Sequence, residues 1–121
     1  MTVLVVNRTR QKVLANQAEE ALGFLDRFVG LMGRRQLKIG DGLILSPCNS
    51  IHTFFMRMPI DALFLDDEGV LVKAYQRLAP WRATGLHRAA RSVVELPAGL
   101  TSSSGTQEGD LIFFERSANS L

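Results

Sequence analysis

The segment "IDALFLDDEGVLVKAYQRLA", residues 60–79, decides the fold because it has the pattern of two strands joined by a tight turn. Its first part is apolar and partly alternating, and "DDEG" at 66–69 is a strong hairpin-turn signal. The returning part, "VLVKAYQRLA", is again rich in apolar and β-branched residues. We therefore expect an antiparallel hairpin at the centre of the chain.

Other strand-like segments lie on both sides of this hairpin. They are short, apolar or β-branched, and bounded by turn residues. The segments are "TVLVV" (2–6), "KVLA" (12–15), "LILS" (43–46), "SIHTFFM" (50–56), "SVVEL" (92–96) and "LIFFE" (111–115). We expect the first two to pair as a hairpin and "GDG" at 40–42 to form a turn. The sequence thus predicts about eight short strands.

One segment has helical periodicity. In "AEEALGFLDRFVGLMGRR", residues 18–35, apolar side chains recur at a spacing of three and four residues. We therefore expect one main helix near residues 19–34. The expected fold class is α+β and mostly β, with a curved antiparallel or mixed sheet or a small open barrel of short strands. The segment 80–91 is expected to be a long exposed loop, and 100–110 a small-residue connector.

Composition limits the class of protein. A chain of 121 residues fits one domain, 1–121. The single cysteine, Cys48, excludes an intramolecular disulfide. The N-terminal apolar run covers only 3–6, and no run approaches the ~18 apolar residues of a membrane span. We expect a cytoplasmic protein with no membrane partner.

The charge distribution is more informative than the net charge of +2. Residues 69–94 contain five basic residues and no acidic one, namely Lys73, Arg77, Arg82, Arg88 and Arg91. A segment of one sign attracts anions, although it is also compatible with an ordinary solvated surface. The basic residues are few and no nucleic-acid-binding motif accompanies them, so a nucleic-acid partner is not expected.

The stretch "PCNSIHTFFMRMPID", residues 47–61, contains most of the chemically reactive side chains. Cys48 and His52 are a metal-ligand or nucleophile combination in type, but the ligand set of a structural zinc site is incomplete. We therefore predict no metal and no cofactor. As a strand, this stretch would place His52, Phe54, Met56 and Met58 on one face. His52 is then either a hydrogen-bonded core histidine or the polar group of an apolar cleft.

Two carboxylates stand within apolar runs. Asp61 needs a partner if it is buried, and Arg57 or backbone N–H groups are candidates. Its alternative role is a general base or ligand anchor with a shifted pKa. Glu95 raises the same question. If their strands were neighbours, the two residues would form a carboxylate pair of glycosidase type. Trp81, beside Arg82, either packs as a lid or presents a stacking face.

Several blocks together resemble a known family. They are "GLMGRRQL" (30–37), the segment from "GDGLIL" to "DDEGVLV" (40–72), "PW" (80–81), "ELPAG" (95–99) and "GDLIFF" (109–114). Their order and spacing are similar to domain-of-unknown-function family number 192, also called uncharacterised protein family 0127, which is bacterial and archaeal.

The resemblance covers the chain from about residue 12 onward and implies a fold but no activity. It marks the characteristic positions of the family as Met56, Arg57, Pro59, Asp61, Glu95 and Gly99. It also implies a short helix after "PAG", where this chain has the polar "LTSSSGTQ", so we keep the prediction of a connector.

These observations favour a small non-catalytic binding domain with a cleft around residues 48–61 for a small polar or anionic ligand. The predicted ligand-binding residues are His52, Met56, Arg57, Asp61, Trp81 and Glu95. The alternatives are a hydrolase-type enzyme that uses Asp61 with His52, and a protein-interaction module that uses a sheet edge or the loop 79–91.

Overall fold

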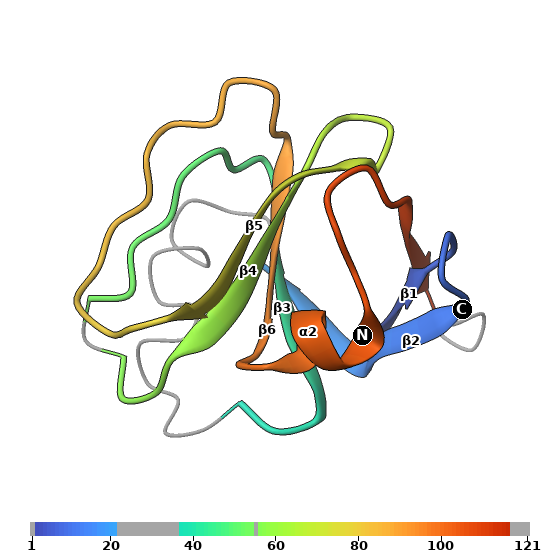
Figure 1. Ribbon diagram of the computed structural model, residues 1–121, viewed down its shortest axis with the longest axis horizontal. Helices are drawn as coiled ribbons and strands as arrows, with labels where there is room; N and C mark the ends of the chain where they lie inside the picture. The colour runs from blue at the N-terminus through green and yellow to red at the C-terminus, as the bar shows by residue number, and fades with distance from the viewer. Residues whose placement is uncertain (1, 22–36, 55, 117–121) are drawn as a thin grey trace.

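The computed structural model of the protein describes residues 2–21, 37–54 and 56–116 (Figure 1). They form a seven-stranded sheet in the order β5-β4-β6-β3-β2-β1-β7. Its strands are β1 (Val3–Asn7), β2 (Lys12–Ala21), β3 (Gly40–Leu45), β4 (Ile60–Leu65), β5 (Leu71–Leu78), β6 (Ser92–Pro97) and β7 (Ile112–Arg116). Only β2 and β3 pair in parallel, so the sheet is mixed, as predicted.

The β4–β5 hairpin has the predicted place and direction. In its turn, the Asp66 side chain accepts hydrogen bonds from the backbone N–H groups of Glu68 and Val70, each at 2.9 Å. Gly69 has a φ of 86°, and a Cβ there would lie 2.7 Å from the backbone oxygen of Ile112. The turn therefore needs glycine for its conformation and for its close approach to β7.

That close approach curls the sheet. The Leu71 N–H donates to Asp110 O at 2.9 Å, and the Ile112 N–H donates to Gly69 O at 2.9 Å. The two edge strands, β5 and β7, therefore meet at one end, and the sheet forms an open half-barrel (Figure 1). The prediction of a curved, mostly β fold is confirmed.

The curled sheet has an apolar cluster on each face. The inner cluster contains residues of all seven strands, such as Val5, Ile44, Leu63 and Val94, and Leu100 of α2 (Leu100–Ser104) packs against it. The outer cluster contains Leu43, Leu45, Ala62, Phe64 and Val93 of the central strands, together with residues of the segments that cover them. Alternate residues of β3, β4 and β6 belong to the two clusters, which explains why β4 and β6 are buried along their whole length.

The predicted helix near residues 19–34 is wrong at its start. Glu19 and Ala21 belong to β2, where they pair with Leu43 and Leu45 of β3. Pairing with β3 therefore outweighs the local helical pattern. The rest of the predicted helix, 22–34, lies outside the described residues. In the part of the chain described, no helix is long and apolar enough to cross a membrane.

Two other predictions around β3 and β4 are wrong. "GDG" at 40–42 opens β3 instead of forming a turn. Gly42 is needed there, because a Cβ would lie 3.2 Å from that of Ala15 and 3.3 Å from that of Ala18 in β2. The described residues of "SIHTFFM" do not form a strand, apart from a single bridge between His52 and Ala83. Its backbone pairs with another loop and not with the sheet.

The predicted connector at 100–110 begins with the helix α2. The flanking residues Gly99 and Gly105 both have positive φ, 95° and 73°, so the helix starts and ends where only glycine fits easily. The sequence did not predict this helix because its composition is polar. Two N–H groups at its start, those of Gly99 and Thr101, donate to the side chain of Asp61, which is distant in the sequence.

Candidate functional site

Two loops run side by side over the outer face of the sheet. We call residues 46–59 and 79–91 the paired loops. Backbone hydrogen bonds of 2.8–3.0 Å join them in antiparallel order, through Thr53–Arg82, Trp81–Thr53, Thr84–Ile51, His87–Asn49 and Cys48–Arg91. Their apolar members Ile51, Met56 and Ala90 belong to the outer cluster. Hydrogen bonds and apolar packing thus hold two irregular segments as one layer on the sheet.

Thr53 is the central residue of this layer. Its side chain is fully buried, and its hydroxyl donates to Ala79 O at 2.6 Å and accepts from the Arg82 N–H at 2.9 Å. Its own backbone N–H donates to Arg82 O at 2.8 Å. One short polar side chain therefore satisfies groups of both loops.

We expect Thr53→Val to lower the free energy of unfolding by about 1–3 kcal/mol, because it removes the buried hydroxyl that accepts from the Arg82 N–H and donates to Ala79 O. Urea unfolding measures this change. The variant should also increase iodide quenching of Trp81, the only tryptophan of the chain. The exposed Thr2 is the matched control, and Thr2→Val should change stability by less than ~0.5 kcal/mol. Equal stability of both variants would contradict the proposed role of Thr53.

The paired loops present three stacked rings, which we call the aromatic ladder: His52, Phe54 and Trp81. The His52 and Phe54 ring centres are 4.7 Å apart with planes 29° from parallel, and those of Phe54 and Trp81 are 5.9 Å apart at 24°. The ladder is exposed, with 38% of Phe54 and 56% of Trp81 accessible to solvent. Contiguous exposed apolar side chains, unlike scattered single ones, can mark a binding surface.

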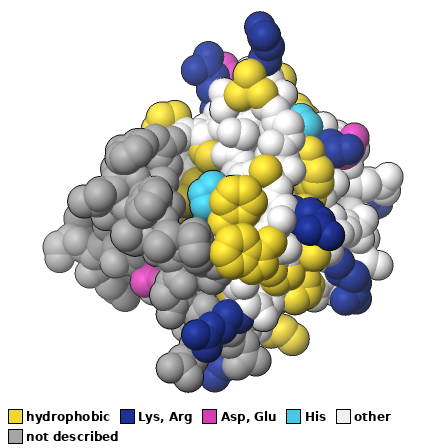
Figure 2. Space-filling view, turned by 90° about the vertical axis from the view of Figure 1, so that its left-hand side faces the viewer, with side chains coloured by type: hydrophobic (Ala, Val, Ile, Leu, Met, Phe, Trp, Pro, Cys, Tyr) yellow, Lys and Arg dark blue, Asp and Glu magenta, His cyan; other side chains and the backbone are white. Residues whose placement is uncertain are grey.

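The charge of the paired loops has one sign. They contain four arginines, Arg57, Arg82, Arg88 and Arg91, and no aspartate or glutamate. All four arginines are exposed. Figure 2 shows hydrophobic and histidine side chains gathered on the face that carries the loops, with Lys and Arg side chains around them. This surface therefore combines ring faces with positive charge.

The surroundings of Asp61 indicate a structural role. It lies in β4 and is fully buried, and its carboxylate accepts three backbone hydrogen bonds. Oδ1 accepts from Arg77 at 2.9 Å and from Gly99 at 3.1 Å, and Oδ2 accepts from Thr101 at 2.8 Å. Of the two interpretations of Asp61, the geometry matches a carboxylate that binds backbone N–H groups.

Glu95 is the unusual carboxyl. It lies in β6 between Leu43 and Ala62 of the neighbouring strands, on the face of the outer cluster. Only 3% of it is exposed, and its Oε2 has no hydrogen-bond partner among the residues that the structure describes. Burial raises the pKa of Glu95 from 4.5 to about 8, because the charged form loses its hydration. Glu95 is therefore mostly a neutral acid at pH 7.

Asp61 and Glu95 do not form a pair. Asp61 pairs with Leu96, whereas Glu95 pairs with Ala62, so the two acids are one position out of register. Because side chains alternate between faces, Asp61 points to the side of the inner cluster and Glu95 to the outer one. The carboxylate pair considered from the sequence, and with it glycosidase-type chemistry, is not formed.

The remaining predicted residues lie in the paired loops. Met56 is buried in the outer cluster, and Arg57 is exposed beside it in the sequence. His52 and Trp81 come together through Phe54, which was placed on the face of His52 but was not among the predicted ligand-binding residues. The spacing of two residues between His52 and Phe54 was the available signal.

A second histidine was also missed. The Nε2 of His87 lies 2.7 Å from the Tyr75 hydroxyl, and its ring packs edge-on against Phe64 at 4.7 Å. His87 lies in a loop, whereas Phe64 and Tyr75 lie in β4 and β5. No local sequence pattern could predict that these three side chains meet.

An open pocket of about 320 Å³ lies at the start of the paired loops. Its lining residues are Pro47, Cys48, Asn49, Ser50, Ala90 and Arg91. The Cys48 thiol donates to Ser50 O at 3.1 Å. The pocket overlaps the predicted cleft 48–61 only at 48–50, and none of the six predicted ligand-binding residues lines it.

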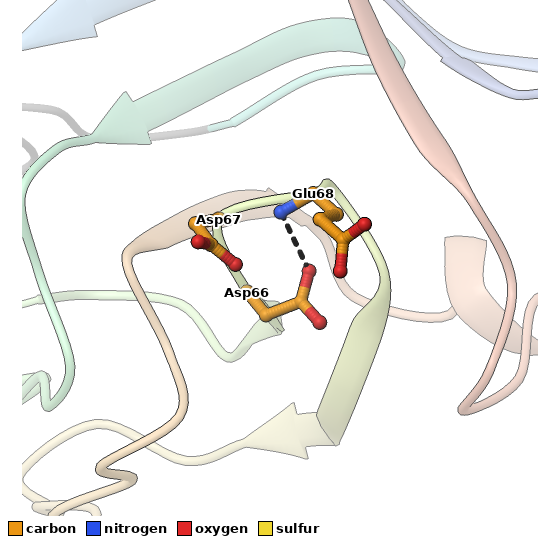
Figure 3. Close-up of side chains that lie close together, drawn as sticks. All are labelled: Asp66, Asp67 and Glu68. Carbon is orange, nitrogen blue, oxygen red and sulfur yellow. Dashed lines mark hydrogen bonds between the residues drawn. The ribbon is translucent and has the colours of Figure 1, made fainter.

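Figure 3 shows the acidic turn between β4 and β5, where Asp66, Asp67 and Glu68 gather. One oxygen of each lies within 4.8 Å of the others. The Asp66 Oδ1 already accepts two backbone hydrogen bonds of this turn. The cluster is therefore explained by turn formation and gives no reason to assign a cation.

Comparisons with known proteins agree on one family. The family model DUF192, described as "Uncharacterized ACR", matches residues 5–114. A UPF0127 protein of Thermococcus gammatolerans is 33% identical over 116 residues, which are 93% of this chain and 75% of that protein. One of Pyrococcus furiosus is 30% identical over 117 residues, which are 93% of this chain and 98% of that protein.

Two solved structures have the same fold. One is a protein of unknown function from Novosphingobium aromaticivorans, with a TM-score of 0.80 and 20% identity, covering 93% of this chain and 84% of that one. The other, from Sinorhizobium meliloti, is described as a "putative transcription regulator", with a TM-score of 0.79 and 22% identity, covering 93% and 91%. At these identities the likeness shows the fold alone.

Proposed function

Because the chain belongs to the DUF192 family, whose function is unknown, we propose its function from its own geometry. The protein is a small non-catalytic binding domain, and its paired loops bind a small anionic ligand that contains a planar ring. The observation that carries the proposal is the exposed aromatic ladder. The rings of His52, Phe54 and Trp81 are already stacked on one another. Little side-chain entropy is therefore lost when a ring of the ligand packs on them.

The arginines of the paired loops supply the charge preference. Four exposed guanidinium groups with no acidic residue in either loop favour a ligand with negative charge. Arg82 follows Trp81 directly, so a ring on the ladder brings its substituents close to a cation. Guanidinium groups bind carboxylate and phosphate with paired hydrogen bonds.

The proposal divides the six residues predicted from the sequence into two groups. His52, Arg57 and Trp81 are ligand contacts, and Met56 supports them from the outer cluster. Asp61 and Glu95 are not ligand contacts, because both carboxyls are buried in the central strands of the sheet. The hydrolase alternative loses support, since Asp61 is buried with both oxygens engaged, whereas His52 is exposed on a loop.

The proposal places the domain in the cytoplasm, where a cysteine thiol such as that of Cys48 stays reduced. It requires no cofactor.

The test uses Trp81 as its own reporter. We expect anions that contain a ring, such as nucleoside monophosphates and aromatic carboxylates, to change the fluorescence of Trp81. Ring-free anions such as phosphate and citrate should not. Phe54→Ala should weaken binding about 5- to 100-fold, because a stacked ring contributes ~1–3 kcal/mol. Isothermal titration calorimetry measures the affinities.

The matched control is Phe113 of β7, which is also 38% exposed but stacks under Arg8 on another part of the sheet. Phe113→Ala should leave the affinity unchanged. If no anion of the panel binds, the small-ligand proposal is wrong, and the exposed rings would instead favour a protein-interaction module.

A further inference from the structure

On the basis of the proposed function, and against the expectation from the sequence that no nucleic acid is bound, we infer that the paired loops bind single-stranded nucleic acid, with bases stacked on the aromatic ladder and phosphates held by the arginines. The inference deepens the proposed site by naming its ligand class. It depends on three observations, namely the geometry of the ladder, the number of arginines and the irregular backbone of the loops.

The ladder has the geometry of a stacking platform. Its planes are within 29° of parallel, and its residues come from both loops, two from one and one from the other. Every nucleobase has a π-face, so such a platform binds bases without selecting a sequence. Bases of a duplex are stacked on one another and cannot reach the rings, which favours a single strand.

The charge on the paired loops exceeds the need of a small anion. A monophosphate can engage one or two guanidinium groups, but the loops expose four, at residues 57, 82, 88 and 91. The arginines are distributed along both loops. Arg57 precedes β4, and Arg91 directly precedes β6. A ligand with a repeating negative charge uses such a distribution, and each phosphate contact releases counterions.

The layered loops also suit a flexible strand. The described residues of the paired loops are held by cross-loop hydrogen bonds and by the buried Thr53, so the backbone that carries the rings and arginines is ordered before binding. Preorganised side chains reduce the entropy lost on association. The described residues of the paired loops contain no helix that could enter a major groove, which is consistent with stacking and backbone contacts as the binding mode.

The experiment measures fluorescence anisotropy of labelled oligothymidine and oligouridine of about ten nucleotides, a length within the site size of single-strand binders. We expect binding at least tenfold tighter than that of thymidine or uridine monophosphate. Phe54→Ala should weaken it about 5- to 100-fold at both ~50 and ~200 mM salt. Arg82→Gln should reduce the slope of log affinity against log salt by about 0.7, the value of one phosphate contact in a single strand.

Two control variants are matched to these changes. Phe113→Ala removes an equally exposed ring, and Lys12→Gln removes an exposed cation at the start of β2. Neither should alter the affinity or the salt slope. Polyphosphate, which has charge but no rings, and a duplex of the same length should compete at least tenfold less well than the oligonucleotide.

The outcomes separate this inference from the proposed function. If monophosphates bind in a Phe54-dependent way and oligonucleotides bind no more tightly, the proposed function stands and the inference is wrong. If neither binds, both are wrong. If oligonucleotides bind but Phe54→Ala has no effect and polyphosphate competes equally, only charge is involved and the inference is overturned.

Discussion

Replacing Glu95 by glutamine should stabilise the protein at neutral pH by about 3 kcal/mol. The carboxyl is 97% buried between apolar neighbours, and burial raises its pKa to about 8 from 4.5. In the unfolded chain the same group ionises freely near pH 4.5. At pH 7 the folded protein therefore keeps a proton that the unfolded chain releases, and this difference favours unfolding by ~1.4 kcal/mol per pH unit. Glutamine has nearly the same shape and does not ionise.

The sign of the pH dependence follows from the raised pKa. The contribution of Glu95 to stability is complete below about pH 4.5, is lost progressively as the pH rises to about 8, and is constant above that. The total loss is on the order of 5 kcal/mol. Glu95→Gln should remove it, so the stability difference between variant and wild type should be near zero at pH 4 and largest at pH 9.

Urea unfolding of both proteins at pH 4, 7 and 9 measures this difference, and other titrating groups cancel in it. Glu115→Gln, in the exposed part of β7, is the control and should show no such trend. A constant difference between Glu95→Gln and wild type across this range would show that the ionised carboxylate is stabilised in the fold after all.

Replacing Asp61 should have the opposite effect. Its carboxylate accepts N–H groups of Arg77, Gly99 and Thr101, which come from the end of β5, from the residue before α2 and from α2 itself. Asp61→Ala leaves these three donors without their acceptor in a buried site. We expect a loss of about 3–5 kcal/mol in the free energy of unfolding, since each buried unsatisfied group costs ~1–3 kcal/mol and water can reach part of the space.

Asp61→Asn should lose less, because its amide oxygen can still accept from one or two of the donors, while its NH₂ faces another. Amide hydrogen exchange should show faster exchange at Gly99 and Thr101 in both variants. Asp67, exposed in the β4–β5 turn, is the control, and Asp67→Ala should change stability by less than ~0.5 kcal/mol. Unchanged exchange at these amides would mean that Asp61 is not their essential acceptor.

The sequence identified Asp61 and Glu95 as carboxylates within apolar segments, but it did not reveal the role of either one. A charged residue in an apolar run shows that a burial cost exists. It does not show which partner offsets it. Asp61 finds backbone N–H groups 16 to 40 positions away, and Glu95 has one oxygen with no partner in the described part of the chain. Only the tertiary structure could distinguish these two cases.

The sequence by itself determined the strands whose partners are adjacent in the chain. The hairpins β1–β2 and β4–β5 were predicted because a turn signal stands between two apolar segments, and a local turn sets their pairing. The family and the mostly β class followed from several such blocks in order. These features depend on short-range chemistry, which the sequence records directly.

The tertiary structure decided the features that depend on long-range pairing. Residues 19–21 extend β2 because β3 lies beside them, and the polar α2 exists because Asp61 binds the backbone at its start. The aromatic ladder exists because two loops distant in the sequence share backbone hydrogen bonds. The opposite orientations of Asp61 and Glu95 depend on a register difference of one residue between β4 and β6. Since a shift of one residue exchanges the faces of a strand, no local pattern could have placed these side chains.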